Sequence, residues 1–330
     1  MPELYQMDKL DAIKYPILSE LEQFVHLFDS SLNASNPLLS EAITHIKQQK
    51  GKMMRPILTL LIARLLGKIS GVTFHSAVAL ELLHTASLVH DDVIDESDKR
   101  RGLESLNTLY DNKLSVLVGD YLLATCLVEA SLTCNDKIIK VIARLGQYLS
   151  EGEILQLSNI HSEEITENVY FDVIRKKTAA LFSACTTVAA LSVNASEEDT
   201  EKARIFGEYI GICFQIKDDI FDYFDDKVIG KPTGNDLREG KLTLPLIYAL
   251  NSTHDKHAEA LAVKVKSGTA STEEINHLIT FAKSNGGIEY AKQKMLEFKK
   301  CAQDLFSHTG NEEIENSLNC YLEYVVDRVK

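Results

Sequence analysis

Two acidic clusters with the same internal spacing are the residues of this chain best suited to hold a metal ion. Both follow the pattern DDxxD, and they comprise Asp91, Asp92 and Asp95, and Asp218, Asp219 and Asp222. On a helix, residues four positions apart lie on one face, so the outer carboxylates of each cluster point the same way. Oxygen ligands around an open site suit Mg²⁺, which usually takes further ligands from water and substrate phosphates. We therefore expect all six aspartates to contribute to Mg²⁺ binding.

The surroundings of the two clusters favour a bound cation over an exposed acidic helix face. Single DDxxD patterns occur often on solvated helices, so one copy is weak support for a metal site. Both copies here lie among apolar residues, where charges are costly unless they are paired or bound to metal. Lys99, Arg100 and Arg101 follow the first cluster directly, as anion-binding groups would.

Further basic residues lie in turns and loops that could hold a second anion. Gly51 to Pro56 reads GKMMRP and places Lys52 and Arg55 before an apolar helix. His84 lies two turns before the first cluster on roughly the same helix face. A glycine-rich loop over residues 230–245 follows the second cluster, as a lid over a diphosphate would. Read alone, these features also fit surface charges, a core histidine and an ordinary loop.

Together these motifs resemble the trans-isoprenyl diphosphate synthase family, and most closely its long-chain, octaprenyl-type branch. The matching motifs run from Gly51 to about Pro245. The resemblance implies that isopentenyl diphosphate and an allylic diphosphate bind to basic and polar residues, with Lys177 also catalytic. The implied substrate-binding residues are Lys52, Arg55, His84, Arg100, Arg101, Lys177, Thr178, Gln215, Lys231 and Lys241.

The resemblance implies a Mg²⁺-dependent prenyltransferase that adds isopentenyl diphosphate repeatedly to an allylic primer. The product would be a long-chain all-trans polyprenyl diphosphate, a precursor of quinone side chains. In short-chain relatives a bulky aromatic residue near the first cluster blocks the tunnel for the growing chain. Ala86 and Ser87 are small at this level, so we expect the tunnel to stay open.

Several alternatives remain at this point. One is a short-chain farnesyl or geranylgeranyl diphosphate synthase. Another is a subunit of a heteromeric synthase, although such subunits commonly lose aspartates or arginines and none of the expected ones is missing here. A metal phosphohydrolase of the HD type is suggested by the adjacent His90 and Asp91, but the other histidines form no suitable ligand set. A terpene cyclase shares an acidic motif but usually lacks the GKxxRP motif, here GKMMRP, that binds a second substrate. An EF-hand at residues 218–229 fails because its sixth position is not glycine.

The composition favours long helices in one domain. Only 16 glycines and 6 prolines occur among 330 residues, well below average usage. Residues 73–95 have the pattern of one long helix, and residues 113–132 that of a buried helix interrupted at Gly119-Asp120. We find no linker or repeat, so we expect a single all-α domain over residues 1–330. The resemblance implies the isoprenoid synthase fold, a bundle of long helices around a deep central cavity.

Charge and targeting signals exclude several classes of partner. The net charge of −13 makes nucleic-acid binding improbable, and no polybasic membrane anchor is present. We find no signal peptide and no apolar run as long as a membrane span. The six cysteines lack CxxC spacing and are expected to be reduced and mostly buried, which indicates a cytoplasmic protein. The resemblance implies a homodimer, with at most transient membrane contact when product is released.

Overall fold

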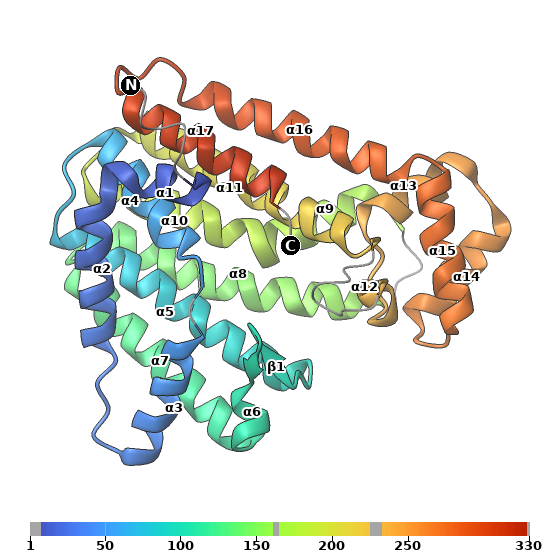
Figure 1. Ribbon diagram of the computed structural model, residues 1–330, viewed down its shortest axis with the longest axis horizontal. Coiled ribbons are helices and arrows are strands. Elements are labelled where there is room, and N and C mark those ends of the chain that lie inside the picture. The colour runs from blue at the N-terminus through green and yellow to red at the C-terminus, as the bar shows by residue number, and fades with distance from the viewer. Residues whose placement is uncertain (1–7, 50, 161–164, 225–232, 329–330) are drawn as a thin grey trace. The chain divides into compact units, whose positions relative to one another are not determined.

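The computed structural model describes residues 8–49, 51–160, 165–224 and 233–328, and α-helices make up most of them (Figure 1). Within these residues the strands are β1 (Lys99–Arg100) and β2 (Leu103–Glu104), which pair antiparallel with Lys99 opposite Glu104. The predicted all-α class is therefore confirmed.

The chain divides into two compact units, each assembled from separate segments of the sequence. The first unit comprises Met1–Gly146, Ser183–Arg204 and His308–Tyr321. The elements that lie wholly within it are β1, β2, α1 (Lys9–Lys14), the 3₁₀ turn η2 (Tyr15–Ile17), α2 (Leu18–Ser31), α3 (Pro37–Gln48), α4 (Met54–Leu66), α5 (Gly71–Ile94), α6 (Leu106–Leu109) and α7 (Asn112–Leu132).

The second unit comprises Gln147–Phe182, Ile205–Ser307 and Leu322–Lys330. The elements that lie wholly within it are α9 (Glu167–Ile174), the π-helical turn η3 (Arg175–Ala179), α12 (Asn235–Arg238), α13 (Leu244–Thr253), α14 (Lys256–Lys266), α15 (Thr272–Ser284) and α16 (Gly287–Leu305). Four helices contribute residues to both units: α8 (Asp136–Ile160), α10 (Ala180–Ser192), α11 (Glu197–Phe221) and α17 (Glu312–Asp327). The single domain expected for residues 1–330 remains a prediction.

The core of the first unit is built on α5, which packs against α7, α4 and α2 (Figure 1). A capping box between Ser70 and Thr73 starts α5, since each side chain accepts a hydrogen bond from the other residue's backbone. α7 is continuous, so the interruption predicted at Gly119-Asp120 is wrong. A Cβ at Gly119 would lie 2.1 Å from the Nε2 atom of His90, so this glycine serves the packing of α5 on α7. The close approach, and not a helix break, explains the residue.

The prediction that the 113–132 segment is buried is also wrong in part. α7 leaves an apolar face exposed, with 62% of Leu127 and 56% of Val128 accessible to solvent. By length and composition alone, α5 and α7 could each cross a membrane, contrary to the expectation that no apolar run is long enough. The most apolar stretch of α5 is 61% buried inside the structure, as in the core helix of a folded protein, against 39% for α7.

In the second unit, α13 packs against α15, α16 and α9. A capping box starts α15: Glu274 N donates to Ser271 Oγ at 3.3 Å, and Ser271 N donates to Glu274 Oε2 at 2.8 Å. All six cysteines of the chain are free, and half of them are buried, which is fewer than expected. The three buried cysteines are Cys126, Cys185 and Cys213.

Candidate active site

The first aspartate cluster lies at the C-terminal end of α5. Asp91 and Asp92 belong to its last turn, and Asp95 is its C-cap residue. Asp92 is buried and accepts hydrogen bonds from Arg100, whose Nε lies 3.0 Å from Asp92 Oδ1. The predicted metal ligand and the predicted diphosphate-binding arginine are therefore in contact. Because a buried carboxylate needs a charged or hydrogen-bonding partner, Arg100 keeps Asp92 satisfied.

A two-residue hairpin places the second predicted arginine of this region. Arg101 and Gly102 both have positive φ values, 51° and 80°, as in the turns that close tight β-hairpins. The Arg101 guanidinium donates to the carbonyl oxygen of Gln49 at 2.7 Å, beside the GKxxRP turn. A Cβ at Gly51 would lie 2.6 Å from Arg101 Nη1, so the glycine of this turn makes room for the arginine. The structure thus brings together two motifs that the sequence separates.

A positive cluster surrounds His84 on α5. Burial first, and then the charges of Arg55, Arg101 and Arg100, hold the pKa of His84 well below its ordinary value. The buried imidazole is therefore neutral near pH 7 and offers one donor and one acceptor. The charges of Arg55, Arg100 and Arg101 all act on this imidazole, so these three predicted substrate-binding residues lie near His84. Lys52, another predicted substrate-binding residue, is exposed.

Glu81 is a member of this cluster that the sequence analysis missed. Burial raises the pKa of the Glu81 carboxyl, while the charges of Arg55 and Arg101 lower it. Glu81 and Arg101 also line one cavity with Gly51. Glu81 precedes His84 by three positions, and residues so spaced on a helix are neighbours. This spacing could have predicted that Glu81 lies beside His84.

The second aspartate cluster lies in the last turn of α11 and just beyond it, and each of its three carboxylates has a protein partner. Asp218 Oδ1 accepts a hydrogen bond from Arg328 Nη2 at 2.7 Å. The Arg328 guanidinium also stacks on the Phe214 ring, 3.8 Å from its centroid. Asp219 is buried and accepts from the Tyr170 hydroxyl at 2.5 Å and from Gln215 Nε2 at 2.8 Å.

Asp222 anchors the segment that follows the second cluster. Its carboxylate accepts hydrogen bonds from the backbone N–H groups of Asn235 and Asp236, at 2.9 and 3.0 Å, and so caps α12. Burial first, and then the charge of Asp222, raise the pKa of Asp236 to about 7. Lys241 follows this helix and lines the same cavity as Asp219, as predicted for a diphosphate-binding residue. Lys231 lies outside the described residues.

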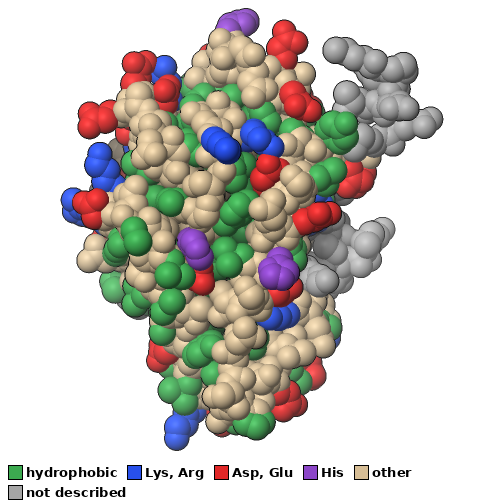
Figure 2. Space-filling view, turned by 90° about the vertical axis from the view of Figure 1, so that its left-hand side faces the viewer, with side chains coloured by type: hydrophobic (Ala, Val, Ile, Leu, Met, Phe, Trp, Pro, Cys, Tyr) green, Lys and Arg blue, Asp and Glu red, His purple; other side chains and the backbone are tan. Residues whose placement is uncertain are grey.

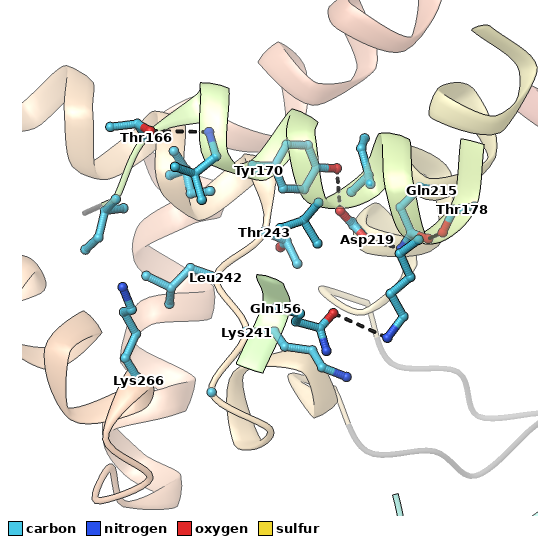
Figure 3. A pocket seen from close by; sticks show the side chains of 17 residues that line it. Gln156, Thr166, Tyr170, Thr178, Gln215, Asp219, Lys241, Leu242, Thr243 and Lys266 are labelled. Carbon is cyan, nitrogen blue, oxygen red and sulfur yellow. Dashed lines mark hydrogen bonds between the residues drawn. The ribbon is translucent and has the colours of Figure 1, made fainter. Parts of the chain in front are cut away.

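Lys177 and Thr178 lie in the π-helical turn η3, between α9 and α10. Such turns insert an extra residue into a helix and occur frequently at functional sites. Thr178 Oγ1 donates to Gln215 Oε1 at 2.7 Å, while Lys177 Nζ lies 2.6 Å from Glu153 Oε1. One cavity is lined by four of the predicted site residues: Lys177, Thr178, Gln215 and Asp219 (Figure 3). The structure therefore gathers the three predicted substrate-binding residues among them around Asp219 of the second cluster.

The donor atoms fit Mg²⁺, although no three acidic, histidine or cysteine side chains of the described residues form a preassembled metal site. Mg²⁺ is usually held by one or two carboxylates, with substrate phosphates and water completing its octahedral coordination. Asp91 and Asp95, one helical turn apart, offer such a pair. Asp92 and Asp218 now contact arginines, so a bound cation at those carboxylates has to compete with these contacts.

The two predicted chain-length residues lie inside α5. Ala86 is fully buried, and the Ser87 hydroxyl donates to the carbonyl oxygen of His84 at 2.9 Å. Their small size is thus matched to close packing on this helix. The tunnel predicted at this level remains a prediction.

Comparison with known proteins identifies the family. The polyprenyl synthetase family model matches residues 36–282. Octaprenyl diphosphate synthase of Haemophilus influenzae is 32% identical over 327 residues, covering 99% of this chain and 98% of the relative. Heptaprenyl diphosphate synthase component 2 of Geobacillus stearothermophilus is 40% identical over 253 residues, covering 76% of this chain and 79% of the relative.

Solved structures agree with this match. A geranylgeranyl pyrophosphate synthase from Bacteroides thetaiotaomicron has 56% identity and a TM-score of 0.86, covering 98% of this chain and 100% of the other. A polyprenyl synthase from Caulobacter crescentus, complexed with calcium and isoprenyl diphosphate, has 27% identity and a TM-score of 0.89, covering 97% and 98%. The chain belongs to the polyprenyl synthetase family, with the isoprenoid synthase fold. It is a prenyltransferase, which excludes the phosphohydrolase and terpene cyclase alternatives.

Proposed function

We propose that the protein condenses isopentenyl diphosphate repeatedly onto an allylic diphosphate to give a long-chain all-trans polyprenyl diphosphate of the octaprenyl type. Such a product is a precursor of quinone side chains. The observation that carries this proposal is the similarity to an octaprenyl diphosphate synthase along nearly the whole chain. The proposal assigns the tunnel to the level of Ala86, a small residue near the first aspartate cluster that its neighbours bury fully.

The proposed reaction begins when the carbon–oxygen bond of the allylic diphosphate ionises. Mg²⁺ would withdraw charge from the leaving diphosphate, with Asp91 and Asp95 as proposed ligands in the first unit and Asp218 as a proposed ligand in the second. Arg100, Lys177 and the lysines of the 230–245 loop stabilise the negative charge that develops on the leaving group. Cations that are in place before the reaction need not move as the charge develops. This preorganisation is the main source of electrostatic catalysis.

The second substrate is isopentenyl diphosphate, whose double bond attacks the allylic cation. We assign its diphosphate to Arg55 and Arg101, with Lys52 as an exposed third cation. The planar guanidinium of arginine matches phosphate oxygens with paired hydrogen bonds. Neutral His84 adds a hydrogen bond without adding charge. No side-chain nucleophile is required, and the released diphosphate removes the proton that completes the new double bond.

We retain one catalytic domain over residues 1–330 as part of the proposal. The family model supports it, because residues 36–282 include segments of both compact units. The metal assignment is supported by the calcium complex of the Caulobacter crescentus relative, which is described with a divalent cation and isoprenyl diphosphate.

A second candidate is a shorter product of geranylgeranyl length. The observation that favours it is the 56% identity to the Bacteroides thetaiotaomicron geranylgeranyl pyrophosphate synthase. The two candidates share every site residue and differ only in where the tunnel ends. Product size separates them directly.

We further propose a homodimer in the cytoplasm that contacts membranes at most transiently. The exposed apolar face of α7 is the surface that we assign to the second copy, because exposed contiguous apolar patches mark interaction sites. The alternative is a heteromeric synthase, suggested by the relative named component 2. No nucleic-acid partner is proposed. On the face shown in Figure 2, the described Lys and Arg side chains lie scattered among acidic and apolar ones, without a broad basic patch.

The metal assignment is tested by Asp91→Ala and Asp218→Ala, assayed with Mg²⁺, isopentenyl diphosphate and an allylic primer. Each variant should lose at least about 100-fold in kcat, because it removes a group that stabilises the leaving diphosphate. Asp304→Ala, an exposed aspartate on α16, is the matched control and should retain wild-type rates. Circular dichroism should show unchanged helix content in all three. A near-normal condensation rate for Asp91→Ala or Asp218→Ala would show that the assignment is wrong.

A further inference from the structure

A chain of three buried or half-buried hydrogen bonds connects α9, the turn η3 and α11 in the second unit (Figure 3). The Tyr170 hydroxyl donates to Asp219 Oδ2 at 2.5 Å. Gln215 Nε2 donates to the other oxygen of Asp219 at 2.8 Å, and Thr178 Oγ1 donates to Gln215 Oε1 at 2.7 Å. Tyr170 belongs to no motif that the sequence analysis used.

The directions of these hydrogen bonds leave little freedom at the second aspartate cluster. Both ends of the Gln215 amide are used, so its orientation is fixed by the donor at Thr178 and the acceptor at Asp219. Each oxygen of Asp219 has one donor, so the plane of the carboxylate is fixed as well. The Tyr170 hydroxyl is the donor in its pair with Asp219, because a carboxylate oxygen accepts the hydrogen bond.

Tyr170 is itself held from several sides. The Thr166 side chain caps α9 by accepting from Val169 N at 3.4 Å. The Tyr170 ring packs edge-on against Phe171, with centroids 5.3 Å apart. On the same helix, Glu167 accepts a hydrogen bond from the Tyr290 hydroxyl at 2.8 Å. A hydroxyl on a ring this constrained can fix the position of its partner, as donors around ligand carboxylates do at metal sites.

We propose that Tyr170 is a positioning residue for the second aspartate cluster. Its hydroxyl orients Asp219 and, through Gln215, aligns Thr178 in the turn that carries Lys177. The aspartates of the second cluster and the pair Lys177 and Thr178 are thereby held in a fixed relative position before substrate binds. The inference rests on the proposed function, since it assigns the cluster and the pair to one diphosphate.

The test compares Tyr170→Phe with Tyr290→Phe. Both substitutions remove one tyrosine hydroxyl that donates to a carboxylate, and both affect contacts of α9, but only Tyr170 contacts an aspartate of the cluster. For Tyr170→Phe we expect the Mg²⁺ concentration for half-maximal activity and the KM for the allylic diphosphate to rise about 10- to 100-fold, the range for lost partners of metal ligands. The KM for isopentenyl diphosphate should change less than twofold. Tyr290→Phe should leave all three constants near wild type.

A double-mutant cycle with Thr178→Val distinguishes a positioning role from a general structural one. If Tyr170 acts through Gln215 on Thr178, the two losses overlap, and the double variant should lose less than the product of the single effects. The inference would be overturned if the losses of the two single variants multiplied in the double variant. It would also be overturned if Tyr170→Phe raised the KM of both substrates equally, or behaved like Tyr290→Phe. Failure of the wild type to condense the two diphosphates would instead overturn the proposed function. Melting temperatures of all variants are measured alongside.

Discussion

At the scale of single residues, the groups expected to bind substrate are held in place by other parts of the protein. Arg100 contacts Asp92, and Arg328 contacts Asp218. Removing a cationic partner from a carboxylate in a partly buried site is costly, so these pairs stabilise the two acidic clusters. Binding of cation and diphosphate then exchanges one set of charge contacts for another.

Most site residues could be predicted because their motifs are local in the sequence. Each motif spans only a few consecutive residues, as in DDxxD, GKxxRP and the Lys177-Thr178 pair. The family resemblance supplied their roles. Arg328 and Tyr170 could not be found in this way. They contact aspartates 110 and 49 positions away, and no local pattern marks a residue for such a contact.

The neutral state of His84 predicts a pH dependence of stability. Its pKa in the folded protein lies well below the ordinary value of 6.5, with burial as the first cause. The unfolded state therefore binds more protons between the two pKa values, so stability is complete above about pH 6.5 and falls as the pH decreases. Relative to His84→Gln, the free energy of unfolding of the wild type should fall by up to about 1.4 kcal/mol per pH unit in this window. Urea unfolding at several pH values measures it, and parallel profiles for the two proteins would contradict it.

At the scale of elements, helix positions followed from the sequence, whereas their irregularities did not. The long helix expected at residues 73–95 is α5, Gly71–Ile94. Gly119 suggested a helix break, but α7 is continuous there. The glycine is needed because a side chain at this position would collide with His90. The turn η3 could not be predicted, since a π-helical turn depends on what packs against it. Gly211 on α11 is one such contact.

Gly211 predicts a strong effect of one added methyl group. A Cβ at this position would lie 2.4 Å from Ala179 Cα, so the backbone of η3 must move. We expect Gly211→Ala to destabilise the protein by about 1–3 kcal/mol or more and to raise the KM for the allylic diphosphate. Gly146→Ala in α8 is the control, because nothing lies within 4 Å of its added Cβ. It should stabilise the protein by about 0.5–1 kcal/mol.

Urea unfolding and steady-state kinetics with each substrate varied in turn measure both glycine variants. Equal changes in stability for Gly211→Ala and Gly146→Ala would show that the approach of Ala179 is not tight. A destabilised Gly211→Ala enzyme with an unchanged KM for the allylic diphosphate would separate packing from substrate binding at η3.

At the scale of the whole molecule, composition and apolar periodicity predicted the fold class, and motifs predicted the chemistry. Few glycines and prolines with long apolar-periodic segments indicate helices, and the structure confirms them. The exposed face of α7 was not predicted, because apolar periodicity does not say whether a helix is covered by its own chain or by a partner. Leu127, at 62% exposure, lies on this face.

The proposed homodimer predicts that a charge on the α7 face separates the two copies. Size-exclusion chromatography with light scattering should give the wild type twice the chain mass of 36.9 kDa. Leu127→Lys should shift it toward one chain mass, because a charge cannot be buried unpaired in an apolar interface. Val263→Lys on α14, with Val263 55% exposed, is the control and should stay dimeric. A wild-type monomer, or a dimeric Leu127→Lys, would contradict the assignment.

We propose that the length of the product is controlled at the level of Ala86 on α5. Ala86→Phe should fill the tunnel and shorten the product to farnesyl or geranylgeranyl length, at a packing cost of about 1–3 kcal/mol. Ser87→Ala replaces one small side chain with another and should leave the product unchanged. A long product from a well-folded Ala86→Phe enzyme would show that the chain takes another route.

The central claim is that the wild-type enzyme makes a long-chain product. The direct measurement is to incubate the purified protein with Mg²⁺, excess isopentenyl diphosphate and an allylic primer, and to size the products by chromatography and mass spectrometry. We expect polyprenyl diphosphates that extend well past geranylgeranyl length, toward the octaprenyl product. A reaction that stops at geranylgeranyl diphosphate while isopentenyl diphosphate remains would contradict it.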